Sequence, residues 1–340
     1  MSGKRYAEAG VDLAGAEAAK QRIARAVEAT RTPAARGRVG AFGGMVAVPS
    51  GLERPILVVS TDGVGTKVLV ARAAGRFDSV GEDLVNHCVN DILVHGAQPL
   101  AFLDYLAGSG LSEEEIAGLV EGVARGCIRH AMTLAGGETA QMPGLYRPGD
   151  YDLAGTIIGV VAEADAIHGD RIVPGDLLVG YESSGLHTNG YTLARKILFD
   201  QLGLELADPL PGDGRTVADA LLAVHRSYFA AVYPVVGRIH GLAHITGGGV
   251  PGNLIRILPE GCAARIDPAS WRWPPLFELL RDAGRVAEEE MRAVFNLGVG
   301  LIAALPSAEL ALVQAGAAQA GVKTWVIGQV AKGERSVRVG

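Results

Sequence analysis

The sequence predicts a protein of the α/β class, or an α+β variant of it, built as a two-domain chain. The chain has 340 residues, which is long for a single hydrophobic core. Strand patterns and helix patterns alternate along both halves. A polar stretch at 168–176, rich in turn-forming residues, separates the halves. The expected domains are therefore residues 1–168 and 169–340.

The first half is expected to hold helices and strands in alternation. A glycine-rich loop at 36–51 precedes the first strand, which is short and β-branched. Ser112 and Glu115 have the spacing of a capping box, which predicts that a helix begins there. The helices are expected at 11–30, 79–95 and 112–130, and the strands at 55–61, 99–106, 132–135 and 151–162.

The second half repeats the alternation. Its loops are marked by glycine, proline and small polar residues at 183–190, 209–214 and 244–249. The helices are expected from 191 to about 202, at 217–239, at 275–283 and at 307–320. The strands are expected at 177–181, 262–266, 297–305 and 323–330.

The composition of the chain argues against nucleic acid and membranes as binding partners. A net charge of −6 gives no basic field for nucleic acid. The three cysteines lack metal or disulfide spacing, which is typical of a reducing compartment. The N-terminal stretch lacks the apolar core of a signal peptide, and no apolar run is long enough to span a bilayer. A cytoplasmic protein that acts on a small molecule, with no nucleic acid or membrane partner, is expected.

The first candidate site is the stretch that follows the strand at 55–61. Asp62 ends the strand, Gly63 and Gly65 open the loop, and Thr66 and Lys67 lead into a helix. Glycines let backbone N–H groups approach a phosphate, and the helix start and lysine add positive charge. The carboxylate suits Mg²⁺. The order is not that of a Walker A loop. Taken alone, the stretch also fits a β-turn with a solvated lysine.

Acidic and amide side chains then interrupt apolar elements. Asn90 stands beside an acid within an apolar helix, where a solvated stripe is the alternative to a site. Asp83 and His87 share a helix face and are expected to be an exposed pair. Four carboxylates fall near the ends of core elements, so they could converge on a metal ion. They are Asp62, Asp91, Asp104 and Glu138.

The second half has two candidate loops. Residues 183–190 carry Ser184, His187 and Asn189 between a strand and a helix, where a helix N-cap at 188 or 189 is the alternative to a site, and both could hold at once. Residues 246–249, of sequence TGGG, form a possible anion nest or a flexible turn.

Taken together, the motifs TDGVGTK, CVNDILVHGAQPLAFLDY, GGETAQMPG, SSGLHTNGY, HITGGG and FNLGVG, in this order, resemble the aminoimidazole ribonucleotide synthetases, or phosphoribosylformylglycinamidine cyclo-ligases. The resemblance runs from about residue 6 to the end. Selenophosphate synthetases and thiamine monophosphate kinases share single motifs, but the full set is more specific. Here the first cysteine lies inside a helix, which disfavours a selenophosphate synthetase.

The resemblance implies an ATP- and Mg²⁺-dependent ligase of de novo purine biosynthesis. Such an enzyme closes the ring of formylglycinamidine ribonucleotide and releases aminoimidazole ribonucleotide, ADP and phosphate. The resemblance also implies a homodimer, with an N-terminal ferredoxin-like dimerising sheet that binds ATP and a C-terminal α/β sandwich that binds substrate. Another ATP-dependent small-molecule kinase or synthetase of the same superfamily is the alternative, and a non-catalytic nucleotide-binding protein is a third.

The resemblance also implies roles for individual residues. The catalytic set is Lys67, His187 and Asp62. The nucleotide side comprises Asp62, Gly63, Gly65, Thr66, Lys67, Asn90, Asp91 and Glu138, of which Asp62, Asp91 and Glu138 hold the metal. The substrate side comprises Ser184, His187, Asn189, Thr246, Gly247 and Gly248. The chain departs from some family members at Ala24, where they have lysine, and within the loop at 36–44.

Overall fold

The computed structural model describes residues 13–38 and 40–340, which divide into two compact units. The first unit extends to Val89 and resumes from Pro99 to Val160. The second unit comprises Asn90–Gln98 and Val161–Gly340. The division is therefore not contiguous in sequence, because the end of one helix packs with the second unit. The expected two-domain α/β fold is confirmed.

The first unit contains a four-stranded sheet of order β1-β4-β2-β3. The strands are β1 (Pro55–Gly63), β2 (Gln98–Gly108), β3 (Thr133–Gln141) and β4 (Tyr151–Ala162). β2 and β3 run parallel, with Tyr105 opposite Glu138. Along β4, buried residues alternate with partly exposed ones, which is the pattern of a sheet covered on one face. On the other face Leu57, Val59 and Tyr105 are exposed.

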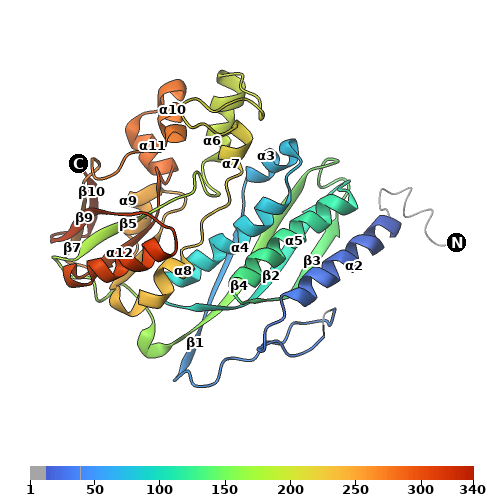
Figure 1. The fold of residues 1–340 in the computed structure, drawn as a ribbon, viewed down its shortest axis with the longest axis horizontal. Helices are drawn as coiled ribbons and strands as arrows, with labels where there is room; N and C mark the ends of the chain where they lie inside the picture. Colours follow the sequence, from blue (N-terminus) through green and yellow to red (C-terminus); the bar gives the residue numbers. More distant parts are fainter. Residues whose placement is uncertain (1–12, 39) are drawn as a thin grey trace. The chain divides into compact units, whose positions relative to one another are not determined.

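Three helices lie side by side over the covered face (Figure 1). They are α2 (Leu13–Ala29), α4 (Asp78–Leu93) and α5 (Glu113–Arg129), while the shorter α3 (Lys67–Ala74) follows β1. Ser112 and Glu115 form the predicted capping box at the start of α5. α5 then presents an apolar stripe to the sheet, which fixes its orientation.

The second unit contains a six-stranded sheet of order β10-β7-β9-β5-β8-β6. All neighbouring strands are antiparallel except β7 and β10. The strands are β5 (Leu177–Glu182), β6 (Gly241–His244), β7 (Cys262–Ile266), β8 (Val299–Leu305), β9 (Thr324–Lys332) and β10 (Ser336–Val339).

Helices cover both faces of this sheet, so each face has its own core. Along β8, Ile302 packs into one cluster with Leu254 of α9, while Leu301 packs into another with Val313 of α12. Successive side chains of one strand therefore pack into two different hydrophobic cores, one on each face of the sheet. The helices are α6 (Tyr191–Arg195), α7 (Val217–Leu221), α8 (Phe229–Val232), α9 (Gly249–Leu254), α10 (Pro275–Gly284), α11 (Glu288–Val294) and α12 (Leu310–Gln319).

The predicted helix at 217–239 is wrong. The chain forms α7, a loop at 222–228, α8 and a 3₁₀ turn at Tyr233–Arg238. Pro234 lacks the N–H for a helical hydrogen bond and Gly237 favours irregular backbone, which explains the late break. The loop at 222–228 carries His225, whose side chain is fully buried.

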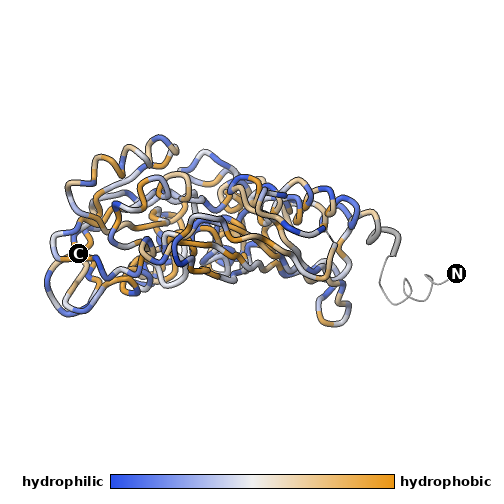
Figure 2. Tube along the Cα trace, turned by 90° about the horizontal axis from the view of Figure 1, so that it is seen from below, coloured by the Kyte–Doolittle hydropathy of each residue, from blue (hydrophilic) through white to orange (hydrophobic). Residues whose placement is uncertain are grey.

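Hydrophobic and hydrophilic residues alternate along the trace of each unit (Figure 2). Within residues 13–38 and 40–340, no helix combines the length and apolar content needed to cross a membrane.

Candidate functional site

The first unit contains a cavity of about 1000 Å³. Its walls come from α2, the loop at 35–45, the start of α5 and all four strands of the sheet, with Thr61 from β1. Ile23, Leu103 and Ile116 give it apolar walls, and backbone and charged groups complete the lining. A cleft of this size and mixed character suits a ligand as large as a nucleotide.

Gly44 brings the loop at 35–45 directly onto the sheet. A Cβ at this position would lie 2.2 Å from the carbonyl oxygen of Ala135 on β3. Only glycine permits that approach, because any side chain would push the loop from the strand. The glycine-rich composition of this loop therefore has a packing reason at the cavity wall.

Charged groups of both signs line the cavity. The basic ones are Lys20, Arg31, Arg36 and Arg38, and the acidic ones are Asp104, Glu113 and Glu138. Arg31 donates to the carbonyl of Gly37 at 2.9 Å, which ties the end of α2 to the loop. Burial raises the pKa of Asp104 to about 6, opposed by a hydrogen bond with its own backbone. Glu138 is exposed within the cavity wall.

The structure corrects the role expected for Lys67. Its Nζ lies 2.7 Å from Asp83, and both side chains are fully buried. Burial lowers the pKa of Lys67, and the pairing with Asp83 opposes that effect. The ammonium group is paired inside the unit and does not line the cavity. Asp83 lies in α4, sixteen positions further along the chain, so this pairing is not visible in the local motif.

The loop that holds Lys67 also lies outside the cavity lining, as far as the described residues define it. Gly63 ends β1 beside the backbone of β4, with Leu153 oxygen 3.3 Å from its would-be Cβ. Gly65 has φ +55°, and Thr66 precedes α3 without capping it through its side chain. The expected turn and helix start are present, but the ATP-sized space lies elsewhere in the unit.

The predicted metal set of Asp62, Asp91 and Glu138 also needs correction. Asp62 lies on β1 and Glu138 on β3, which are opposite edges of the sheet. Three strand spacings separate them, about 14 Å, too far for both carboxylates to bind one ion within one chain. The sequence could not reveal this because strand order is non-local.

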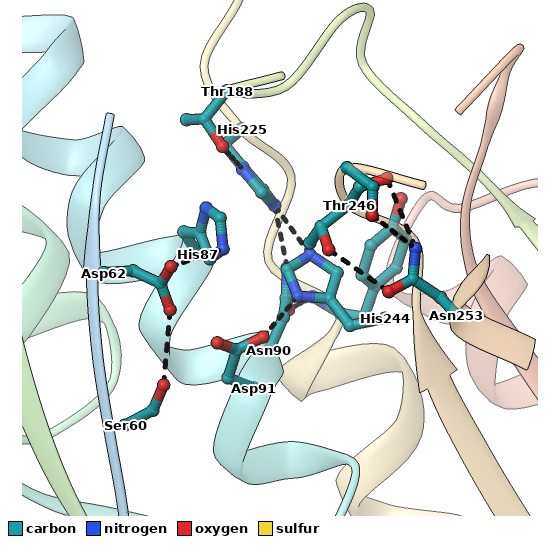
Figure 3. A network of polar contacts seen from close by, with 12 residues as sticks. Ser60, Asp62, His87, Asn90, Asp91, Thr188, His225, His244, Thr246 and Asn253 are labelled. Carbon is teal, nitrogen blue, oxygen red and sulfur yellow. Dashed lines mark hydrogen bonds and ion pairs between the residues drawn. The ribbon is translucent and has the colours of Figure 1, made fainter. Parts of the chain in front are cut away.

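Asp62 instead makes two local contacts. Ser60 Oγ donates to its Oδ2 at 3.3 Å, and His87 Nε2 lies 3.6 Å from its Oδ1 (Figure 3). Asp83 and His87 are both buried, so the expected exposed pair is wrong. The shared helix face points toward the sheet rather than toward solvent.

The loop at 183–190 in the second unit is held from several sides. Ser183 Oγ donates to Asn296 Oδ1 at 2.9 Å, and Asn296 Nδ2 donates to the carbonyl of Gly185 at 2.8 Å. Ser184 Oγ donates to the carbonyl of Val224 at 2.6 Å. These hydrogen bonds fix the conformation of the loop. The alternative of a side-chain N-cap at 188 or 189 is not found, because Gly190 is the N-cap residue of α6 and no side chain caps the helix.

His187 adopts an unusual backbone conformation within this loop. Its φ of +62° lies in the left-handed region, which costs about 1–3 kcal/mol for a non-glycine residue. The imidazole is buried, and its Nε2 accepts from the Ser184 N–H at 3.2 Å. Strain of this kind concentrates at functional sites, so the loop is a candidate for ligand recognition.

Asn189 and the glycine loop at 246–249 form the neighbouring surface. The Asn189 Nδ2 atom is buried and has no acceptor among the described residues, as expected of a group that meets a ligand. Asn189 Oδ1 lies 3.4 Å from the would-be Cβ of Gly247. Asn253 Nδ2 donates to the carbonyls of Thr246, Gly247 and Gly249, which fixes the loop.

A chain of imidazoles lies in the same unit (Figure 3). Asp91, in the last turn of α4, accepts from His244 Nδ1 at 2.7 Å. His244 Nε2 lies 3.1 Å from His225 Nε2, and His225 Nδ1 lies 3.4 Å from Thr188 Oγ1. The ring of His225 also stacks on His187, with centroids 4.0 Å apart.

Asn90 is fully buried and orders the centre of this network. Its Oδ1 accepts from the Tyr228 N–H at 2.9 Å, and its Nδ2 donates to the carbonyl of Arg226 at 2.8 Å. Sequence reasoning singled out Asn90, Asp91 and His187, and considered Asn296 as a site amide or a strand-edge residue, but missed His225 and Asn253 as network members. His225 follows a helical apolar pattern, so no local signal marked it.

The two units together define a class: a two-domain α/β protein with a nucleotide-sized cavity in one domain and a polar, strained loop in the other. The AIR synthase related protein N-terminal domain matches residues 44–161, and the AIR synthase related protein C-terminal domain matches residues 173–340. The chain belongs to the AIR synthase related protein family.

Relatives extend over nearly the whole chain. A phosphoribosylformylglycinamidine cyclo-ligase of Sorangium cellulosum is 46% identical over 96% of this chain and 94% of that protein. Thiamine-monophosphate kinase of Stenotrophomonas maltophilia is 21% identical, with a TM-score of 0.69 over 94% of each chain. Hydrogenase maturation protein HypE in complex with ATP is 18% identical, with a TM-score of 0.60 over 94% of this chain and 90% of that one. The last two show the fold.

Proposed function

We propose that this protein is an ATP-dependent cyclo-ligase that closes the imidazole ring of formylglycinamidine ribonucleotide and releases aminoimidazole ribonucleotide, ADP and phosphate. The observation that carries the proposal is 46% identity, over nearly the full length of both chains, to a protein named phosphoribosylformylglycinamidine cyclo-ligase. Both domains of the family are matched, so the likeness is not confined to one unit.

The cavity of the first unit is the proposed ATP site. Its apolar walls suit the adenine ring, and Arg31, Arg36 and Arg38 supply positive charge for phosphates. The glycine-rich loop at 35–45 lets backbone come close to the ligand. Lys67 is left out of this site because its ammonium group is paired with Asp83. A HypE structure that holds ATP has the same fold, which is compatible with this placement.

Mg²⁺ fits the oxygen donors of the cavity. Glu138 is an acidic residue of the cavity wall, and Mg²⁺ prefers such hard oxygen ligands together with nucleotide phosphates. When bound, the ion would neutralise phosphate charge. We assign Glu138 as the protein ligand, while Asp62 remains a candidate catalytic residue on the opposite edge of the sheet.

The chemistry needs two bond changes. The γ-phosphoryl group passes from ATP to the formyl amide oxygen, which breaks its bond to ADP. The amidine nitrogen then attacks the former formyl carbon, the carbon–oxygen bond breaks, and inorganic phosphate leaves with that oxygen. Positioning and charge neutralisation supply most of the acceleration. The nitrogen also loses a proton during ring closure.

The second unit offers groups for substrate binding and for this proton. Ser184, Asn189 and the loop Thr246–Gly248 are the proposed substrate contacts. His187 is the proposed proton acceptor or donor, because imidazole can change charge near neutral pH. The buried Asn189 Nδ2 supports a ligand at this place.

A homodimer formed through the open face of the first-unit sheet completes the proposal. Leu57 and Val59 leave this face apolar and exposed. Exposed apolar patches of this kind are typical of association surfaces.

An isotope experiment tests the reaction. Purified protein is mixed with ATP, Mg²⁺ and formylglycinamidine ribonucleotide labelled with ¹⁸O at the formyl oxygen. Cyclo-ligase activity yields aminoimidazole ribonucleotide and phosphate in equal amounts, with the label in phosphate. A kinase, the alternative in this superfamily, would keep phosphate on its product. Unlabelled phosphate, or ADP without the aminoimidazole product, would refute the proposal. The same mixture without the ribonucleotide measures background ATP hydrolysis.

A further inference from the structure

The paired imidazoles of His225 and His244 have the geometry of two ligands to one ion. Their Nε2 atoms are 3.1 Å apart, and their ring centroids are 5.2 Å apart at an interplanar angle of 58°. Two nitrogens at metal distances of about 2.0–2.1 Å and 3.1 Å from each other subtend roughly 100° at the ion, close to tetrahedral.

The partners of the other ring nitrogens are compatible with two Nε2 lone pairs that face each other. His244 Nδ1–H donates to Asp91 Oδ1 at 2.7 Å. The corresponding nitrogen of His225 faces Thr188 Oγ1 at 3.4 Å, where it can donate. With Nδ1 protonated on both rings, each Nε2 is an acceptor. Two acceptors at 3.1 Å repel each other unless a cation lies between them.

The surroundings resemble the outer shell of a metal site. A carboxylate on the far nitrogen of a histidine, as Asp91 is to His244, orients the ring toward a metal ion. Asn90 Nδ2 also lies 3.2 Å from His225 Nε2. That contact is the longer of its two, since Asn90 also donates to Arg226 at 2.8 Å, so an ion can displace it while the amide keeps its second acceptor.

We propose that His225 and His244 bind a d-block divalent cation such as Zn²⁺, with His187 as a third ligand in the metal-bound form, while its proton-transfer role belongs to the metal-free form. One ring nitrogen of each of these three buried histidines lies within 4.8 Å of the other two. His187 now stacks on His225 at a centroid distance of 4.0 Å, so its ring turns from stacking to coordination. Imidazole ligands select such ions over Mg²⁺, which keeps this site distinct from the carboxylate of the first unit.

Zn²⁺ titration of the untagged, metal-free full-length protein tests the site, with calorimetry for affinity and Co²⁺ absorption for geometry. We expect one tight Zn²⁺ per chain and the visible bands of tetrahedral Co²⁺. His225→Gln and His244→Gln each weaken binding by about 100-fold or more, and Asp91→Asn by about 10- to 100-fold. His240→Gln is the matched control, because His240 pairs with Asp176 at 2.8 Å outside the three-histidine cluster.

Failure of the wild-type protein to bind one Zn²⁺ per chain overturns the proposal, and a proton then serves between the rings instead. Equal affinity in wild type and His225→Gln also overturns it. Melting curves without metal show whether each variant folds. If His225→Gln does not fold, the Co²⁺ spectrum of wild type and the affinity of His244→Gln decide. None of these measurements requires enzyme turnover, so they are independent of the proposed reaction.

Discussion

Two buried groups in the first unit oppose each other in their response to pH, and this gives a quantitative prediction. His130 at the end of α5 contacts Asn86 Oδ1 through Nε2 at 3.0 Å. Burial, with a smaller effect of Arg129, lowers the pKa of His130 from 6.5 to about 4. Burial raises the pKa of Asp104 from 3.8 to about 6. The first group favours the folded state at high pH, and the second favours it at low pH.

The magnitudes follow from linkage, at about 1.36 kcal/mol for each pH unit of difference between folded and unfolded pKa. His130 stabilises the fold above pH 6.5, and about 3 kcal/mol of that is lost as pH falls from 7 to 4. The contribution of Asp104 to the free energy of unfolding is fully present below pH 3.8 and falls by about 3 kcal/mol as pH rises through 6. When pH falls from 7 to 4, about 2 kcal/mol of that contribution returns. The two contributions nearly cancel over this range.

Single substitutions should therefore uncover opposite slopes. His130→Gln removes the titration while keeping an amide donor for Asn86. Relative to wild type, this variant should gain about 3 kcal/mol in free energy of unfolding between pH 7 and 4. Asp104→Asn should lose about 2 kcal/mol over the same interval. The double variant should follow the wild-type slope.

The distribution of tryptophan provides the internal control. All three tryptophans, Trp271, Trp273 and Trp325, belong to the second unit. Urea unfolding of the first unit is followed by hydrogen exchange in α4 and α5, while fluorescence follows the second unit. The fluorescence transition should not change with either substitution. Parallel pH slopes for wild type and both single variants would refute the reasoning, since neither group would then titrate differently in the folded state.

Three further predictions concern function. Gly44→Ala places a methyl group 2.2 Å from a strand β3 carbonyl and should weaken binding of a non-hydrolysable ATP analogue by about 10-fold, so unchanged affinity would place the nucleotide elsewhere. Glu138→Gln should lower kcat by about 100-fold at saturating Mg²⁺. His187→Ala should lower kcat with little change in nucleotide KM. A pure affinity defect in either variant would contradict the role proposed for that residue. Val59→Lys should convert a dimer to a folded monomer in sedimentation, whereas Leu312→Lys on the second unit should not.

Elements with a strong local pattern could be predicted from the sequence. The capping box at Ser112 and the long strand ending at Ala162 both have signals within a few residues, and both are present. Short elements such as β6 and α9 were missed because four to six residues carry too little periodicity. The helix expected at 217–239 failed because apolar spacing alone does not register the loop that places His225 in the core.

Site residues divide in the same way. Glu138 and His187 stood out because an acid after two glycines and an imidazole in a polar loop are locally unusual. The burial of Lys67 in an ion pair depends on Asp83, and the separation of Asp62 from Glu138 depends on the order of the strands in the sheet. Both are non-local facts that a single sequence does not contain.

The expected domains, residues 1–168 and 169–340, place all of α4 in the first half of the chain. The helix begins in the first unit, yet its last turn carries Asn90 and Asp91, which belong to the second unit. There they bond to His225, His244 and the backbone of the loop at 222–228. Cleaving the chain at residue 168 would separate these side chains from their partners. Substitution at Asp91 therefore perturbs the second unit, although the residue lies early in the chain.

Ring closure needs one kind of catalytic group that simple phosphoryl transfer does not need. A kinase needs a nucleotide site, cationic groups and a metal, which the proposed function assigns to the cavity of the first unit. Ring closure also needs a group that removes a proton from the attacking nitrogen. The second unit supplies a strained, buried imidazole at His187, with hydroxyl and amide groups in the same loop. Loss of His187 should therefore leave phosphorylated substrate accumulating in single-turnover experiments, whereas loss of Glu138 should block phosphorylation itself.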